Sequence, residues 1–75
     1  MSPKLPRVTA SELLRALKRD GWEVQRQRGS HLILAHPSKV GLLVVPMHTG
    51  QLKVGLVADT LKDAGLTPDD LRRLS

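Results

Sequence analysis

The chain has 75 residues, the length of one small domain with a thin hydrophobic core, and we expect residues 1–75 to form that domain. There is no cysteine, which excludes disulfide bonds and metal centres held by cysteine. No apolar run is long enough for a signal peptide or a transmembrane helix, so we expect a cytoplasmic protein with no membrane partner.

Basic residues outnumber acidic ones, and they are concentrated in the first part of the chain. Twelve lysines and arginines stand against seven aspartates and glutamates, which gives a net charge of +5. Residues 1–28 alone contain seven of these cations and only three anions. Such an imbalance favours a polyanionic partner, most simply a nucleic acid, although charge alone leaves an ordinary basic protein equally open.

The first predicted helix spans residues 9–20, after a proline-containing lead-in over residues 1–8 that we expect to be extended. Thr9 and Glu12 have the spacing of a capping box, in which each side chain bonds the other residue's backbone amide. Leucine and alanine then recur at helical spacing, and Gly21 supplies the left-handed residue that ends many helices.

Three short strands follow, predicted from alternating or continuous apolar residues between turn residues. They are expected over residues 22–27, 30–35 and 40–45. The last strand is stopped by Pro46. The connections between the strands are too short for parallel crossovers, so we expect an antiparallel meander. A helix over about 53–64 and a short helix over about 68–74 complete the chain.

This order of elements, α-β-β-β-α with a short C-terminal helix, predicts an α+β two-layer sandwich with helices on one face of a three-stranded antiparallel sheet. It is also the order of the double-stranded-RNA-binding domain. The second and third strands are apolar on both faces, whereas the strands of a sheet that is covered on one side usually alternate apolar and polar residues. We therefore expect a protein partner or self-association, as a homo- or hetero-oligomer, on the uncovered face, unless twist or helix packing hides both faces.

Three histidines are the candidate catalytic residues, because imidazole serves as a base or an acid near neutral pH. His31 follows a glycine turn close to Arg26 and Arg28, and flanking cations suit a phosphodiester target. His36 precedes a proline turn, and His48 lies in the loop before the second helix. For each histidine, a structural role without chemistry remains the alternative.

Neither a metal site nor a serine nucleophile is expected. The histidines and acidic residues have no spacing typical of metal ligands, so we expect no metal and no other cofactor. Ser30 and His31 are neighbours in a predicted strand, where side chains point to opposite faces, so Ser30 is expected to support the turn. Gly29 suits a positive φ angle or the close approach of a ligand backbone.

From Ser11 to Leu66 the chain resembles the HicA family of toxins, also called the YcfA-like family. The resemblance rests on several short sequence motifs that occur in the same order and with the same spacing as in the family. They are Leu14-x-x-Leu17, Asp20-Gly21-Trp22-Glu23-Val24, Arg26-Gln27-Arg28-Gly29-Ser30-His31, His36-Pro37, Val45-Pro46-Met47-His48 and Leu61-Lys62-Asp63-Ala64-Gly65-Leu66. The chain departs from the family where Gly55 is followed by Leu56, since members often carry threonine after this glycine.

The resemblance implies a fold like that of the double-stranded-RNA-binding domain and a ribonuclease that cleaves messenger RNA independently of the ribosome. It also implies neutralisation by a HicB-like antitoxin encoded beside the toxin, which would account for the uncovered apolar face. The essential histidine of the family falls on His31. The resemblance thus predicts the toxin component of a type II toxin–antitoxin system.

We hypothesise that His31 acts as general base on a ribose 2′-hydroxyl in a metal-independent endoribonuclease. The expected RNA contacts are Arg26, Arg28, Gly29, Ser30 and Lys53. The sequence identifies no general acid, and His48 is only a candidate auxiliary residue. The alternative is a double-stranded-RNA-binding module without catalysis, because such a module needs cationic and polar contacts but no aromatic residues.

Overall fold

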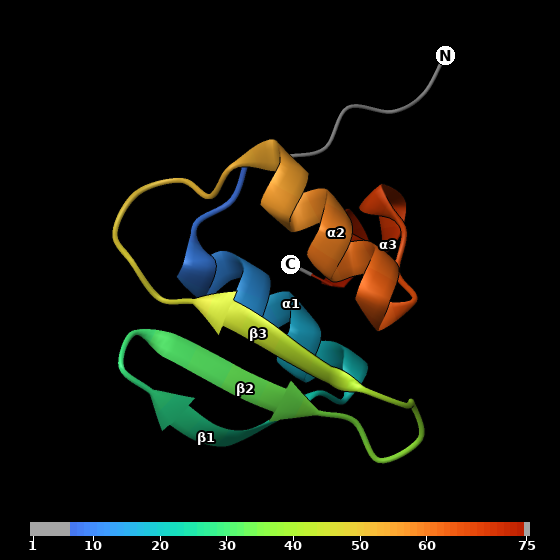
Figure 1. Ribbon diagram of the computed structural model, residues 1–75. Coiled ribbons are helices and arrows are strands. Elements are labelled where there is room, and N and C mark those ends of the chain that lie inside the picture. Colours follow the sequence, from blue (N-terminus) through green and yellow to red (C-terminus); the bar gives the residue numbers. More distant parts are fainter. Residues whose placement is uncertain (1–6, 75) are drawn as a thin grey trace.

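A computed structural model describes residues 7–74, with the helices on one side of a three-stranded sheet (Figure 1). The elements in chain order are α1 Ala10–Asp20, β1 Glu23–Arg28, β2 His31–Ala35, β3 Leu42–Pro46, α2 Val54–Ala64 and α3 Pro68–Leu74. This is the α+β two-layer arrangement that the sequence predicts. Within residues 7–74 no helix is both long and apolar enough to cross a membrane.

Helix α1 has the capping signals that the sequence predicts. The amide of Thr9 donates to the Glu12 carboxylate at 2.9 Å, and the amide of Glu12 donates to the Thr9 hydroxyl at 3.2 Å. These bonds satisfy amides at the helix start, and the Thr9 amide lowers the pKa of Glu12 below its usual value. Gly21 ends the helix with a φ of 109°, in the left-handed region where a side chain would be strained.

Helix α3 starts with the same kind of reciprocal bond. The amide of Thr67 donates to Asp70 Oδ2 at 2.9 Å, and the amide of Asp70 donates to the Thr67 hydroxyl at 3.1 Å. The Arg73 guanidinium, 2.8 Å from the carboxylate, and the Thr67 amide lower the pKa of Asp70 to about 2. Helix α2 begins after Lys53 without a side-chain cap, so it depends more on the burial of its apolar face.

The strands pair in the order β1-β2-β3, and both neighbouring pairs are antiparallel. Strand β3 starts at Leu42 rather than at the predicted Val40. The reason is that Gly41 turns the chain with a φ of 92°, which leaves Val40 98% exposed. Pro46, predicted to stop this strand, is its last residue and pairs with His31 at the end of the ladder. A proline is tolerated there because β3 is an edge strand.

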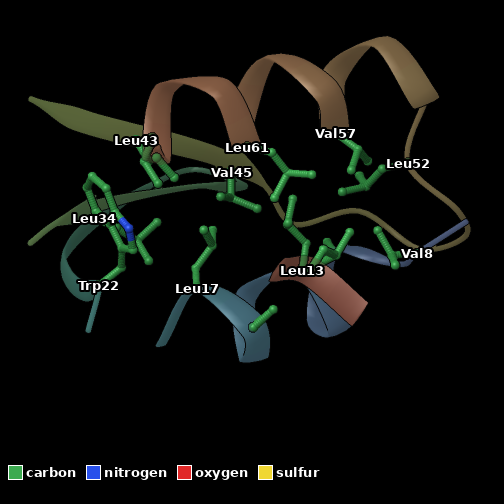
Figure 2. Close-up of a cluster of buried hydrophobic side chains, with 14 residues drawn as sticks. Val8, Leu13, Leu17, Trp22, Leu34, Leu43, Val45, Leu52, Val57 and Leu61 are labelled. Carbon is green, nitrogen blue, oxygen red and sulfur yellow. The ribbon is translucent and has the colours of Figure 1, made fainter. Parts of the chain in front are cut away.

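The helix-facing side of the sheet forms the core (Figure 2). The largest fully buried side chains are Trp22, Leu13, Leu17, Leu34, Leu61, Leu71, Val45 and Val57. Trp22, predicted inside the first strand, instead precedes β1 and lies in this core. Of the expected lead-in, residues 1–6 lie outside the described part, whereas Val8 is buried and its carbonyl accepts from the Leu52 amide at 2.9 Å.

In the described part of the chain, no helix lies over the opposite side of the sheet (Figure 1). Leu42 and Val44 of β3 point to this side and remain 61% and 51% exposed. Their neighbours Leu43 and Val45 alternate with them along the strand and are buried. The sheet therefore has the uncovered apolar face that the continuous apolar strands predict.

Candidate active site

The turn of Gly29 and Ser30 between β1 and β2 is held by hydrogen bonds on both sides. Gly29 has a φ of 60°, which type II′ hairpin turns need at their first central position and which glycine adopts without strain. The Gln27 side chain donates to the Gly29 carbonyl at 2.8 Å, and the Met47 amide donates to the Ser30 carbonyl at 2.6 Å. These bonds fix the turn just before His31, the first residue of β2.

The strand register places His31 on the uncovered face of the sheet. His31 lies opposite Arg28 of β1 and Pro46 of β3, and opposite residues of an antiparallel pair share a face. The next residue along β2, Leu32, pairs with the buried Val45 and so faces the core. His31 therefore points away from the helices, and a shift of the strand register by one residue would turn it toward them.

A β-bulge in β1 brings Arg26 and Arg28 to this open face. The register shifts between Val24 and Arg26, so that Val24 pairs with the buried Leu34 whereas Arg26 pairs with Ile33. In a regular strand, Val24 and Arg26 would share a face, but the extra residue of a bulge separates them. Val24 is therefore on the core side, and both arginines are on the side of the candidate histidine.

The resulting cluster joins one imidazole to two guanidinium groups. Arg28 lies directly across from His31, at the pair spacing of about 5 Å between Cβ atoms, and Arg26 is one open-face row further along. All three side chains are exposed, and within residues 7–74 no hydrogen bond or ion pair holds the His31 ring. In the same described part, no three histidine or acidic side chains are grouped to hold a metal ion. The cluster can bind a phosphate and exchange a proton beside it.

His48 lies in the loop after β3, near the end of the sheet that carries His31. This placement follows from Pro46, which pairs with His31, and from the Met47 amide that bonds the turn. The His48 side chain is exposed, and its Nδ1 lies 3.2 Å from the Thr49 carbonyl. A proton on Nδ1 would satisfy this carbonyl and leave Nε2 available for proton exchange.

Lys53 is not brought to this cluster. It precedes α2 at the far end of the 47–53 loop and belongs to the helical layer, whereas His31 is on the other face of the sheet (Figure 1). The Lys53 side chain is exposed. A ligand that touches both residues would therefore have to extend around the edge of the sheet.

His36 has a structural role. Its Nε2 lies 2.7 Å from the Asp20 carbonyl at the end of α1, and its Nδ1 accepts from the Ser38 amide at 3.0 Å. The ring is edge-on to Trp22, with 5.3 Å between ring centroids, and the side chain is only 8% exposed. It also lies so close to Gly21 that a Cβ there would approach Nε2 to 2.7 Å. Because both ring nitrogens have partners, the structural alternative holds for this histidine.

Sequence reasoning missed several residues that position the candidate site and the helices. Lys39 Nζ donates to Asp20 Oδ2 at 2.7 Å and to the Ala64 carbonyl at 2.8 Å, which ties the ends of α1 and α2 together. The bond of the Met47 amide to the turn was missed as well. The bonds of Lys39 and Met47 depend on which segments the fold brings together, and no local sequence signal reports that, whereas the Gln27 bond spans only two residues within the β1–β2 turn.

Comparison with known proteins shows which family the chain belongs to. A family model described as the HicA toxin of bacterial toxin–antitoxin systems matches residues 10–66, a segment that contains α1, the whole sheet and α2. A search of curated proteins found no match. Since the family model covers most of the chain, the protein belongs to the HicA toxin family of bacterial toxin–antitoxin systems.

Proposed function

We propose that this HicA family member is an endoribonuclease that cleaves messenger RNA with His31 as general base and without a metal ion. The observation that carries the proposal is the exposed row of Arg28 and His31 on the uncovered face, with Arg26 in the next row. This arrangement combines a group that exchanges protons near neutral pH with two groups that bind phosphate well. Membership of a toxin family supports an activity that harms the cell.

The proposed reaction begins when His31 removes the proton from a ribose 2′-hydroxyl. The 2′-oxygen attacks the adjacent phosphorus, and the bond from phosphorus to the 5′-oxygen of the next nucleotide breaks. Arg26 and Arg28 offset the negative charge that grows on the phosphate oxygens in the transition state. The products are a 2′,3′-cyclic phosphate, which water can open to a 3′-phosphate, and a 5′-hydroxyl.

The leaving 5′-oxygen needs a proton, and His48 is the candidate donor. It is exposed in the loop that follows Pro46, the residue paired with His31. A neutral His31 and a protonated His48 at one end of the sheet would divide the roles of base and acid. The Met47 amide bond to the turn supports this division, because it holds the start of the His48 loop close to β2.

Gly29, Ser30 and Lys53 complete the proposed RNA contacts. Apart from its chain neighbours, no described residue has an atom within 4 Å of where a Cβ on Gly29 would lie, so a sugar–phosphate backbone can approach the turn closely. Ser30 is exposed beside it and offers a hydroxyl donor for a phosphate oxygen. Lys53 would bind a phosphate further along the strand, because it lies in the helical layer.

The mechanism predicts the chemical ends of the cleaved RNA. The purified chain, separated from any antitoxin, is expected to yield 5′-hydroxyl ends together with 2′,3′-cyclic phosphate or 3′-phosphate ends, as measured by mass spectrometry. Cleavage should continue in EDTA. Products with 5′-phosphates, or full dependence on added Mg²⁺, would contradict a metal-free mechanism. Binding of duplex RNA without cleavage would instead favour a non-catalytic RNA-binding module.

We also propose that a HicB-like antitoxin occupies the uncovered face of the sheet. The family implies an antitoxin partner. Leu42 and Val44 are exposed there, and Val44 pairs with Ile33 to continue the apolar surface across β2. Apolar surfaces of this kind are typical of protein interfaces. Because His31 borders the same surface, an antitoxin bound there would also block the access of RNA.

Leu42→Asp is expected to weaken antitoxin binding by at least about tenfold, because an unpaired carboxylate in an apolar interface is strongly unfavourable. Leu42 is at the end of the sheet far from His31, so cleavage by the free toxin should be unchanged. Val40→Asp, in the 98% exposed turn position before β3, is the matched control. Titration calorimetry with the antitoxin measures the effect. Equal affinities of the two variants for the antitoxin would argue against this interface. If the free toxin forms a dimer and Leu42→Asp makes it monomeric, the uncovered face binds a second copy of the chain instead.

A further inference from the structure

A shallow groove of about 410 Å³ follows the outward side of α1. Its lining residues are Ser11, Leu14, Arg15, Lys18 and Arg19. They recur every three or four positions and so form one stripe of the helix, opposite the stripe that is buried in the core. Three of the five side chains are cationic and none is acidic, so the groove is positively charged.

The two carboxylates of α1 do not neutralise this stripe by ion pairing. Glu12 is hydrogen bonded to the Thr9 amide at 2.9 Å, and Asp20 is paired with Lys39 Nζ at 2.7 Å. Among residues 7–74, neither carboxylate forms an ion pair with Arg15 or Lys18. The basic half of the chain therefore has a second concentration of positive charge besides the arginines of β1.

We propose that this groove is a second RNA-binding site, which holds the phosphate backbone of the RNA that His31 cleaves. Helix positions three or four apart have Cβ atoms about 5–6 Å apart, a spacing of the same order as the roughly 3.4 Å of helix axis per phosphate along one strand of a B-form duplex. The long side chains of Arg15 and Lys18 can thus each reach a separate phosphate. Ser11 adds a hydroxyl donor at the end of the groove.

The composition of the surface favours RNA over an acidic protein as the occupant. Protein interfaces have an apolar centre, and charged residues are depleted there. The large hydrophobic residues that are exposed in the described part of the chain are Val24, Val40, Leu42, Val44 and Val54. None of them is on α1, and the one apolar residue that lines the groove, Leu14, is half-buried, so cationic side chains outnumber apolar ones in the lining and suit phosphate contacts better than a protein interface.

The inference rests on the proposed function, because it gives the same substrate a second contact. His31 is on the uncovered face of the sheet, whereas α1 lies on the other side of the sheet (Figure 1) and its groove side is turned away from the core, in a molecule whose smallest dimension is 17 Å. A short RNA bound at His31 cannot reach the groove, whereas a long RNA can pass around the edge of the sheet. The groove thus raises the affinity for long RNA without taking part in the chemical step.

The test compares Arg15→Gln/Lys18→Gln with Lys62→Gln/Arg73→Gln, which removes the same charge from α2 and α3. Arg19 is kept, because its guanidinium bonds the Leu74 carbonyl at 3.1 Å. The long substrate is an RNA of about 30 nucleotides, which at roughly 3.4 Å each is longer than the protein. With this RNA, the variant Arg15→Gln/Lys18→Gln (the α1 variant) should have a KM about tenfold higher than the parent, because it loses two screened phosphate contacts. Its kcat, and its cleavage of an RNA of about four nucleotides, should match the parent.

Binding is measured separately in proteins that also carry His31→Ala. The α1 variant is expected to raise the Kd for long RNA about tenfold and to reduce the slope of log K against log salt by about 1.4, since each lost phosphate contact of single-stranded RNA contributes about 0.7. Unchanged binding and slope would overturn the inference. An equal loss in the control would also overturn it, because net charge alone would then explain the effect.

Two further outcomes separate this inference from the proposed function. If the α1 variant loses affinity for the antitoxin but not for RNA, the groove is a protein-docking surface and the inference is wrong. If His31→Ala still cleaves RNA, the proposed base is wrong, yet the binding comparison continues to decide the role of Arg15 and Lys18. If the parent does not bind RNA at all, both proposals fail.

Discussion

Replacing His31 with alanine is expected to slow RNA cleavage by about 10²–10⁴-fold, the usual contribution of one general base. The side chain is exposed, and no hydrogen bond holds its ring within residues 7–74, so its removal should change the free energy of unfolding by less than about 0.5 kcal/mol. A lower single-turnover rate with an unchanged melting temperature would therefore report the chemistry. The chain must be assayed free of antitoxin, since a bound antitoxin would mask its activity.

Two variants at the same end of the sheet sharpen this result. His31→Gln keeps a polar side chain of similar size but cannot accept a proton near neutral pH, so it should be as inactive as His31→Ala. His48→Ala should lower kcat if this residue protonates the leaving oxygen. A parent-like rate for His31→Ala would refute the base, and a rise in KM at constant kcat would make His31 a binding residue only.

The features that depend on neighbouring residues could be predicted from the sequence. Thr9 and Glu12 form the predicted capping box of α1, by bonds that span three residues. Gly29 has the positive φ expected for a glycine in a short hairpin turn. In each case the chemistry is contained within one turn of chain, so the pattern predicts the structure without knowledge of the tertiary contacts.

The face of the sheet on which the candidate residues lie could not be predicted in the same way. Val24, Arg26 and Arg28 alternate in the sequence, which for a regular strand places all three on one face. One bulged residue separates the valine from the arginines, and nothing in the local sequence marks it. The role of His36 was equally hidden, because it depends on a bond to the carbonyl of Asp20, sixteen positions away.

Trp22→Ala is expected to lower the free energy of unfolding by about 3–5 kcal/mol, the cost of removing a buried tryptophan. This is a large share of the roughly 5–15 kcal/mol that stabilises a typical domain. Trp22 is 1% exposed and lies in the core beside Leu34 (Figure 2). Its ring also packs edge-on against His36, which bonds the end of α1, so the cavity would open where α1, β1 and the β2–β3 turn meet. Urea denaturation measures the loss.

Trp22→Phe is the matched comparison. The Trp22 Nε1 is buried without a hydrogen-bond partner among the described residues, so phenylalanine loses volume but no hydrogen bond, and should cost about 1–2 kcal/mol. Val40→Ala, at a 98% exposed position, should change stability by less than about 0.5 kcal/mol. If Trp22→Ala were as mild as Val40→Ala, the ring would not belong to the core.

The phenylalanine variant also tests whether the site is independent of this part of the core. Trp22 precedes the start of β1, whereas His31 pairs with the last residue of β1, so the two lie at opposite ends of the sheet. The turn before His31 is fixed by its own bonds from Gln27 and Met47. The Trp22→Phe variant should therefore cleave RNA at the parent rate under all conditions in which it is folded. Loss of cleavage in the folded variant would mean that packing at the Trp22 end controls the position of His31.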